Sequence, residues 1–233
     1  MGFIVAIDGP AGSGKGTVTK LVAKRENLIS IDTGAMYRCI ALECLNNNIT
    51  ENQINKIEEV LKKIDIDLKN EDGIQKVYLN KKDVTKQIRE TKVNNVVAKF
   101  AAIKIVRDKV TPIQRKMGER QNIIMEGRDI GTVVFPDADV KIYLDCSVEE
   151  RAKRRYKQNL ENGIKCTYEE ILKSIQERNK LETEREIAPL RQAEDAIYID
   201  SSNMTIEEVE QKIIEIINQK KISRGEKFET SFL

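Results

Sequence analysis

A glycine-rich loop between a short strand and a helix constrains this chain more than any other stretch. Residues 3–8, Phe-Ile-Val-Ala-Ile-Asp, form an apolar run rich in β-branched side chains, which is typical of a buried strand. A helical pattern begins at Gly16, after the strand has been broken by glycines. The loop and its end comprise Gly9, Pro10, Ala11, Gly12, Ser13, Gly14, Lys15, Gly16 and Thr17.

The spacing of Gly9, Gly14 and Lys15 predicts a phosphate-binding loop. Backbone N–H groups at the helix N-terminus surround phosphate oxygens there, while the lysine neutralises them. Glycine lets the backbone approach the phosphates and adopt positive φ. Gly16 occupies the position after the lysine, so that the hydroxyl comes one place later, at Thr17. We expect this loop to bind a nucleoside triphosphate.

The composition excludes several classes of function. The chain of 233 residues has 40 Lys and Arg against 38 Asp and Glu, a formal net charge of +2, which gives no overall field for nucleic acid or an acidic membrane. It contains no histidine, so a mechanism cannot use an imidazole base or ligand. Phosphoryl transfer remains possible, because it depends on positioning and cationic stabilisation more than on a base.

The location and redox state follow from what the sequence lacks. No run approaches the roughly 18 apolar residues that span a bilayer, and the N-terminus does not resemble a signal peptide. We therefore expect a cytoplasmic protein. Its four cysteines lie in separate predicted elements without a C-x-x-C pair, which predicts unpaired thiols and no zinc site.

Alternating strands and helices predict an α/β fold with a five-stranded parallel sheet flanked by helices. The predicted strands are residues 3–8, 28–32, 122–126, 140–145 and 196–200. Capping boxes are predicted at Thr50–Gln53, Ser147–Glu150, Thr167–Glu170 and Thr205–Glu208, and Asp32 or Thr33 could cap the helix that runs to about Asn46. Pro112 is expected to interrupt the helical stretch 92–119.

Residues 64–89 have a different pattern. Two runs, 64–68 and 75–79, alternate with period two around the turn residues 70–73, which predicts a small antiparallel unit inserted into the core. Asn80-Lys-Lys-Asp83 matches the guanine-reading N-K-x-D of GTPases. No D-x-x-G element precedes it, so we interpret it as a polar turn.

Ligands of a parallel sheet collect beyond the carboxyl ends of its strands. The phosphate loop, residues 33–38 and residues 126–129 therefore face one cleft, together with the start of the helix at Arg151. Arginines that this topology brings to the cleft are Arg38, Arg128, Arg151, Arg154, Arg155, Arg178 and Arg185. Arg128 directly follows a buried strand, and a guanidinium fork can hold phosphate oxygens in two parallel hydrogen bonds.

These residues carry a family resemblance. The loop resembles that of nucleoside monophosphate kinases, and three further runs resemble bacterial cytidylate kinases: Asp32-Thr-Gly-Ala-Met-Tyr-Arg38, Glu126-Gly-Arg-Asp-Ile-Gly-Thr-Val-Val-Phe-Pro-Asp137 and Ile187-Ala-Pro-Leu190. The similarity covers residues 3 to about 220. It implies a monomer that transfers the γ-phosphoryl group of ATP, with Mg²⁺, to CMP or dCMP. It also implies a kinase core over 1–222, an acceptor-binding region at about 64–89, a short lid at about 151–166 and a polar tail at 223–233.

The resemblance implies a role for each matching residue. The loop and Arg151 would bind ATP, and Thr17 would hold Mg²⁺ together with Glu126, which acts through water where related enzymes usually have aspartate. Catalytic cations would be Lys15, Arg128, Arg155 and Arg178. Acceptor-binding residues would be Thr33, Tyr37, Arg38, Arg107, Arg128, Asp129, Arg178, Glu182 and Arg185. Ala98 replaces a serine that is common in related enzymes, which removes one hydroxyl contact near the sugar or base.

Three other functions remain open on the sequence. A kinase for a different nucleotide would have the same loop. A nucleotide-dependent switch would bind a protein partner without transferring a phosphoryl group, although the chain lacks D-x-x-G and has an arginine-rich cleft. A nucleic-acid module could use the basic stretch 151–157, where Tyr156 is the sole aromatic residue.

Overall fold

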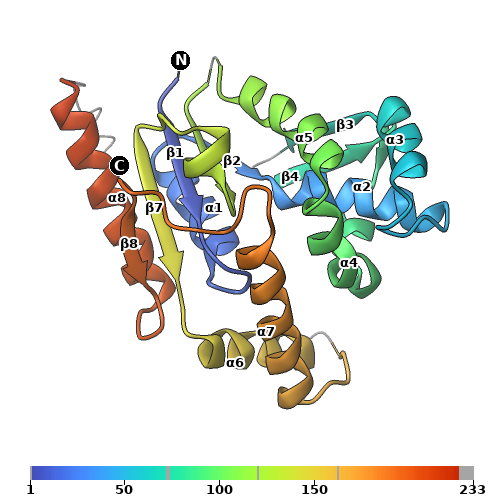
Figure 1. Cartoon of the computed structure of the whole chain (residues 1–233). Coiled ribbons are helices and arrows are strands. Elements are labelled where there is room, and N and C mark those ends of the chain that lie inside the picture. Colours follow the sequence, from blue (N-terminus) through green and yellow to red (C-terminus); the bar gives the residue numbers. More distant parts are fainter. Residues whose placement is uncertain (1, 72–73, 120, 162, 226–233) are drawn as a thin grey trace.

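A parallel sheet forms the centre of the molecule (Figure 1). The computed structural model describes residues 2–71, 74–119, 121–161 and 163–225. Within these ranges the sheet has five strands, in the order β2 (Ile29–Asp32), β6 (Ile123–Gly127), β1 (Ile4–Asp8), β7 (Val140–Asp145) and β8 (Ile197–Asp200). All four neighbouring pairs are parallel. The predicted α/β class and all five predicted strands are confirmed.

Helices cover both faces of the sheet. Val5 and Ile7 of β1 pack with α1 (Lys15–Arg25) and α8 (Ile206–Ser223) on one face. Ile4 and Ala6 point to the other face, into the core that includes α2 (Gly34–Asn46). Strands with both faces buried read as continuous apolar runs, which is why the sequence shows no alternation there. None of the helices in the described ranges has the length and apolar character needed to cross a bilayer.

A second, antiparallel sheet lies beside the core sheet, next to α2 and α3 (Ile54–Lys63) in Figure 1. It consists of β3 (Ile66–Glu71), β4 (Ile74–Leu79) and β5 (Lys82–Asp83). The predicted antiparallel unit is therefore confirmed. Asn80 and Lys81 have positive φ values of 50° and 66°, as a two-residue type I′ hairpin turn requires, so the polar-turn interpretation is confirmed for these two residues, while Lys82 and Asp83 form β5. Part of the predicted turn 70–73 lies outside the described residues.

The predicted helix starts have mixed outcomes. Thr167 and Thr205 form complete capping boxes at α7 (Tyr168–Glu184) and α8. Ser147 Oγ accepts a hydrogen bond from Glu150 N, 3.2 Å away, at the start of α6 (Val148–Glu161). The prediction for Thr50 is wrong: α3 begins at Ile54, and Gln53 Oε1 accepts from Thr50 N instead, at 3.0 Å.

Thr33 does not cap α2 through its side chain. Its hydroxyl donates to Glu126 O at 2.7 Å, across the gap between β2 and β6. A tertiary acceptor thus takes the hydroxyl of Thr33, one of the two residues that the sequence offered as caps. The hydrogen bond places Thr33 beside the end of β6, where the candidate site lies.

The predicted interruption at Pro112 is wrong. The break lies between α4 (Thr91–Ala101) and α5 (Lys104–Met117), where Ile103 is extended, and Pro112 lies inside α5. A proline removes one helical N–H donor, but Val106 and Val110 are fully buried and hold this helix against the core. Tertiary packing therefore overrides the local signal.

We predict that Thr205→Ala destabilises the protein by about 1 kcal/mol, because α8 loses the hydroxyl that accepts from Glu208 N. The midpoint of thermal unfolding should fall by roughly 2–4 °C, as measured by circular dichroism. Thr50→Ala is the matched control, because Thr50 is exposed and does not cap α3. Equal effects of the two substitutions would contradict the assignment of the cap.

Candidate active site

The glycine-rich loop lies between β1 and α1. Lys15 is buried, and its Nζ donates to Pro10 O at 2.6 Å and to Ser13 Oγ at 3.1 Å. Burial, and then the charge of Arg128, lowers the pKa of Lys15 to about 7. An anion bound in the loop would favour the charged lysine and reverse that shift.

Backbone geometry accounts for the glycines of the loop. Gly12 and Gly14 have φ values of 84° and 92°, a region that side chains disfavour. A Cβ on Gly9 would stand only 2.1 Å from Leu144 O on β7. The loop therefore passes close against the sheet and ends with the first N–H groups of α1 directed outward.

Arginines of α6 support the loop from the other side. Arg151 Nη1 donates to Ala11 O at 3.0 Å and to Asn179 Oδ1 at 2.9 Å, which ties the loop to α6 and α7. Arg154 Nη2 donates to Ser201 O at 2.8 Å, and Ser201 Oγ donates to Ser13 O at 3.2 Å. Arg151 is thus at the loop, as the sequence predicts. Its guanidinium already bonds the backbone there.

Glu182 of α7 lies between two of the predicted arginines. Its carboxylate accepts from Arg128 Nε at 2.8 Å and from Arg178 Nε at 2.9 Å. The Glu182 side chain is 4% exposed. Burial alone would raise the pKa of this carboxyl, but the two arginines lower it to about 2. The pair with Arg128 joins the end of β6 to α7, whereas the pair with Arg178 lies within α7.

Asp32 makes a second arginine cluster. Its Oδ2 accepts from Arg38 Nη2 at 2.7 Å and from Arg89 Nη2 at 2.6 Å. Burial opposes the ionised form, but the two arginines hold the pKa of Asp32 at about 2. Arg38 Nε is buried without a hydrogen-bond partner among the described residues. In the sequence, Asp32 carries only the signal of a possible helix cap, and no motif points to Arg89.

Asp129 forms the third cluster. It pairs with Arg107 of α5 and with Arg185 Nη2, the latter at 3.7 Å. The Arg107 guanidinium also lies over the ring of Tyr37, 5.5 Å from its centroid. The Tyr37 hydroxyl is buried beside the side chain of Gln114, and burial raises its pKa to about 12. Gln114 Oε1 is buried without a hydrogen-bond partner among the described residues, and no motif in the sequence points to this glutamine.

Glu126 reaches the start of α1. A Cβ on Gly16 would lie 3.0 Å from Glu126 Oε1, so the carboxyl fills the space above that glycine. Burial, and then the charge of Asp32, raises the pKa of Glu126 to about 7. Thr17 is exposed on the first turn of α1. The two predicted metal residues therefore both lie at the first turn of α1.

Arg155 lies on α6, within range of the charge of Arg178 on α7. Its Nη1 donates to Gln158 Oε1 at 2.9 Å. Burial and the neighbouring charge of Arg178 lower its pKa. The structure thus brings Arg155 near one of the other predicted catalytic cations, within the α6–α7 unit that lies below the sheet in Figure 1.

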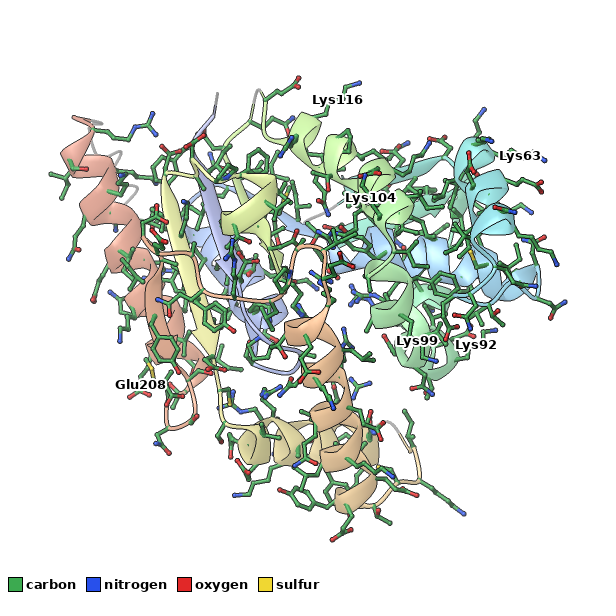
Figure 2. The ribbon with its side chains drawn as sticks, viewed as in Figure 1. Lys63, Lys92, Lys99, Lys104, Lys116 and Glu208 are labelled. Carbon is green, nitrogen blue, oxygen red and sulfur yellow. The ribbon has the colours of Figure 1, made fainter. Side chains whose placement is uncertain are left out.

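The cationic site is built locally, as the near-neutral net charge requires. Figure 2 shows Lys63, Lys92, Lys99, Lys104 and Lys116 on the outer surfaces of α3, α4 and α5, where they are exposed. The arginine clusters instead come from the carboxyl ends of strands and the helices beside them. A glycine loop faces these clusters, an arrangement that can hold two phosphate groups end to end.

Comparison with known proteins agrees with this geometry. A family model described as cytidylate kinase matches residues 5–219. The chain is 51% identical over 207 residues to a cytidylate kinase of Fusobacterium nucleatum, covering 89% of this chain and 93% of that one. It is 47% identical over 216 residues to a cytidylate kinase of Bacillus subtilis, covering 93% and 96% of the two chains.

Among solved structures, an uncharacterized protein from Eubacterium ventriosum has a TM-score of 0.50 at 13% identity. The match covers 93% of this chain and 98% of that one. At this identity the likeness concerns the fold alone.

We predict that Glu182→Gln destabilises the protein by about 3 kcal/mol at pH 7, because Arg128 and Arg178 lose their shared anion. A carboxyl whose pKa falls from 4.5 to about 2 on folding contributes stability above pH 4.5 that is lost as the pH falls toward 2. Urea denaturation should show the difference from the wild type falling to about half or less at pH 3.

The control for this pH dependence is Glu184→Gln, on the same helix but exposed. It should change stability little at either pH. A destabilisation by Glu182→Gln that is the same at pH 7 and pH 3 would show that the ion pairs are not its source.

Proposed function

This chain belongs to the cytidylate kinase family, and we propose that it transfers the γ-phosphoryl group of ATP to CMP or dCMP, giving ADP and CDP or dCDP. The observation that carries the proposal is that buried Lys15 of the glycine loop lies within range of the charges of Arg128 and Glu182, and that Glu182 in turn pairs with Arg128 and Arg178. Phosphoryl transfer needs little covalent help from a protein, because positioning and cationic stabilisation supply most of the catalysis. The absence of histidine is compatible with that chemistry.

The donor nucleotide would bind along the loop. Residues 9–17 offer N–H groups at the start of α1, and Lys15 would bridge the phosphate donor and the developing charge. Lys15 Nζ is held by Pro10 O and Ser13 Oγ, both within the loop, so a phosphate oxygen can take over these contacts without a large movement. Arg151 would act by holding the loop from behind as well as by its charge.

The acceptor phosphate would bind among Arg38, Arg128 and Arg178. Each of them bonds a carboxylate through one nitrogen, and a guanidinium has five N–H donors, which leaves capacity for a phosphate. The pyrimidine would bind near Asp129, Arg107, Arg185 and Thr33. Gln114 Oε1, which is buried beside Tyr37 and has no hydrogen-bond partner among the described residues, supports this placement, because such an atom marks a position that a ligand can satisfy. Cytosine offers a donor at N4 and acceptors at O2 and N3, which suits a carboxylate beside arginines.

The residues present fit a magnesium ion. Mg²⁺ usually retains several waters and is held by one or two carboxylates together with substrate phosphates. Glu126, which lies against Gly16, and Thr17 supply oxygen donors of that kind beside the phosphate loop. When bound, the ion would neutralise charge on the phosphate oxygens. The raised pKa of Glu126 fits a carboxyl that gains by the arrival of a cation.

The segment at about 151–166, in α6 and its connection to α7, would act as the lid and the antiparallel sheet as part of the acceptor region. Closure of these parts over the ligands would exclude water, which otherwise competes as the acceptor. Arg155 would approach the transferring group in that step. We also propose a cytoplasmic monomer that uses neither nucleic acid nor membrane as a partner.

A coupled assay of ADP release with Mg²⁺ tests the proposal against a panel of CMP, dCMP, UMP and AMP. We predict that CMP and dCMP are used far better than UMP and AMP, because a cytosine edge matches the set of Asp129 and arginines. ADP release without an added monophosphate would instead favour a nucleotide-dependent switch. Preference for AMP or UMP would assign the chain to a different acceptor.

We further predict that Arg128→Ala lowers kcat by about 10³-fold or more, in the range of an arginine that stabilises phosphoryl transfer in other systems. The fold should persist, because Glu182 keeps Arg178 as a partner. Steady-state kinetics and a thermal melt measure the two effects. Arg191→Ala removes an exposed guanidinium and is the control. Near-normal turnover of Arg128→Ala would remove this residue from the phosphate role.

A further inference from the structure

The segment that carries Arg128 and Asp129 continues into a single π-helical turn, η2 (Ile130–Val134). Val133 N and Val134 N both donate to Asp129 O, at 2.9 and 3.2 Å. Such a short turn leaves N–H groups without helical partners at its start and C=O groups at its end. Its orientation therefore depends on what satisfies these groups from outside.

Asp8 satisfies the start of the turn. Its Oδ1 accepts from Ile130 N at 2.8 Å, and its Oδ2 accepts from Gly131 N at 2.7 Å. Asp8 is 5% exposed and is the last residue of β1, directly before Gly9. Both carboxylate oxygens are used, so the contact needs an ionised acid. An asparagine would turn a donor toward one of the two N–H groups.

Arg115 satisfies the end of the turn. Its Nε donates to Val134 O at 3.0 Å and its Nη2 to Val133 O at 2.8 Å. A negative group at the N-terminal end and a positive group at the C-terminal end both complement the dipole of a helical turn. The two side chains come from β1 and α5, outside the 126–137 run.

Helix α5 holds the same segment at a second point. Arg107 pairs with Asp129, just before the turn, and Arg115 bonds the carbonyls at its end. The two arginines are eight residues apart, a separation of about 12 Å along a helix, and Pro112 between them does not break it. One continuous helix therefore fixes both ends of residues 129–134.

We propose that Asp8 and Arg115 are positioning residues that clamp η2 and thereby aim Arg128 and Asp129 at the acceptor nucleotide. This inference rests on the proposed function. Neither residue has to touch a substrate. Asp8 also connects the two halves of the site, because the residue after it begins the loop that would bind the donor.

Arg115→Met tests the clamp by removing both donors while keeping an unbranched stem on an exposed position of α5. Isothermal titration should show that the Kd for CMP rises about tenfold, because small misplacements of substrate-positioning groups have large effects. The Kd for ATP should stay within about twofold, since the phosphate loop does not contact Arg115. Arg115→Lys keeps the charge and one donating group, so its Kd for CMP should lie between those of the wild type and Arg115→Met.

Lys116→Met is the matched control. It removes the same charge from the next residue, whose side chain extends away from the molecule in Figure 2, and should leave both affinities unchanged.

Asp8→Asn should weaken CMP binding as well. It leaves one N–H of Ile130 or Gly131 without an acceptor.

CMP binding by the wild type tests the proposed function, and CMP binding by the variants tests the clamp. Failure of the wild type to bind CMP would overturn the proposed function. Normal CMP binding by Arg115→Met, or an equal loss of CMP and ATP affinity, would overturn only the clamp. A variant with a lower melting temperature but unchanged CMP affinity would assign Arg115 a purely structural role and would also overturn it.

Discussion

The pairing of buried arginines with buried carboxylates is the constraint on which this site depends. An arginine without an anion would be expensive to bury, and several of them would repel one another. Asp32, Asp129 and Glu182 each hold two guanidinium groups, and each comes from a different element. The arginines are thus charged and oriented before any ligand arrives, which is the condition for strong electrostatic stabilisation of a transferring phosphoryl group.

Much of this arrangement could be predicted from the sequence, because it follows from local patterns and from topology. Apolar runs give the strands, and parallel strands bring Arg128 and the phosphate loop to one edge. The partners of these groups could not be predicted. Arg89 bonds Asp32 across 57 positions, and Asp8 bonds Ile130 across 122. Such contacts depend on how distant elements pack against one another, and the spacing of residues within a motif does not reveal that packing. A charged residue directly at the end of a buried strand, as at Asp8 and Asp32, is the one signal available.

Helix α5 shows why a local rule can fail and what the failure means. Proline disfavours a helix interior because it lacks one N–H and crowds the preceding turn. Ala102 and Ile103 carry no such signal, yet the chain breaks there, since α4 and α5 bury separate apolar stripes. A helix broken at Pro112 would have uncoupled Arg107 from Arg115. The continuous helix keeps both on the segment that follows β6, so packing decides the geometry of the site as well as the fold.

The absence of a side chain at Gly16 leaves space for the carboxyl of Glu126. A glutamate is one methylene longer than an aspartate, and the carboxyl of Glu126 lies where a Cβ of residue 16 would approach to 3.0 Å. Glycine at this position therefore leaves space for the longer acid. The carboxyl sits at the positive end of α1, which favours its ionised form, while burial and Asp32 oppose it. The balance of these effects leaves an acid that a cation beside the phosphate loop can readily ionise.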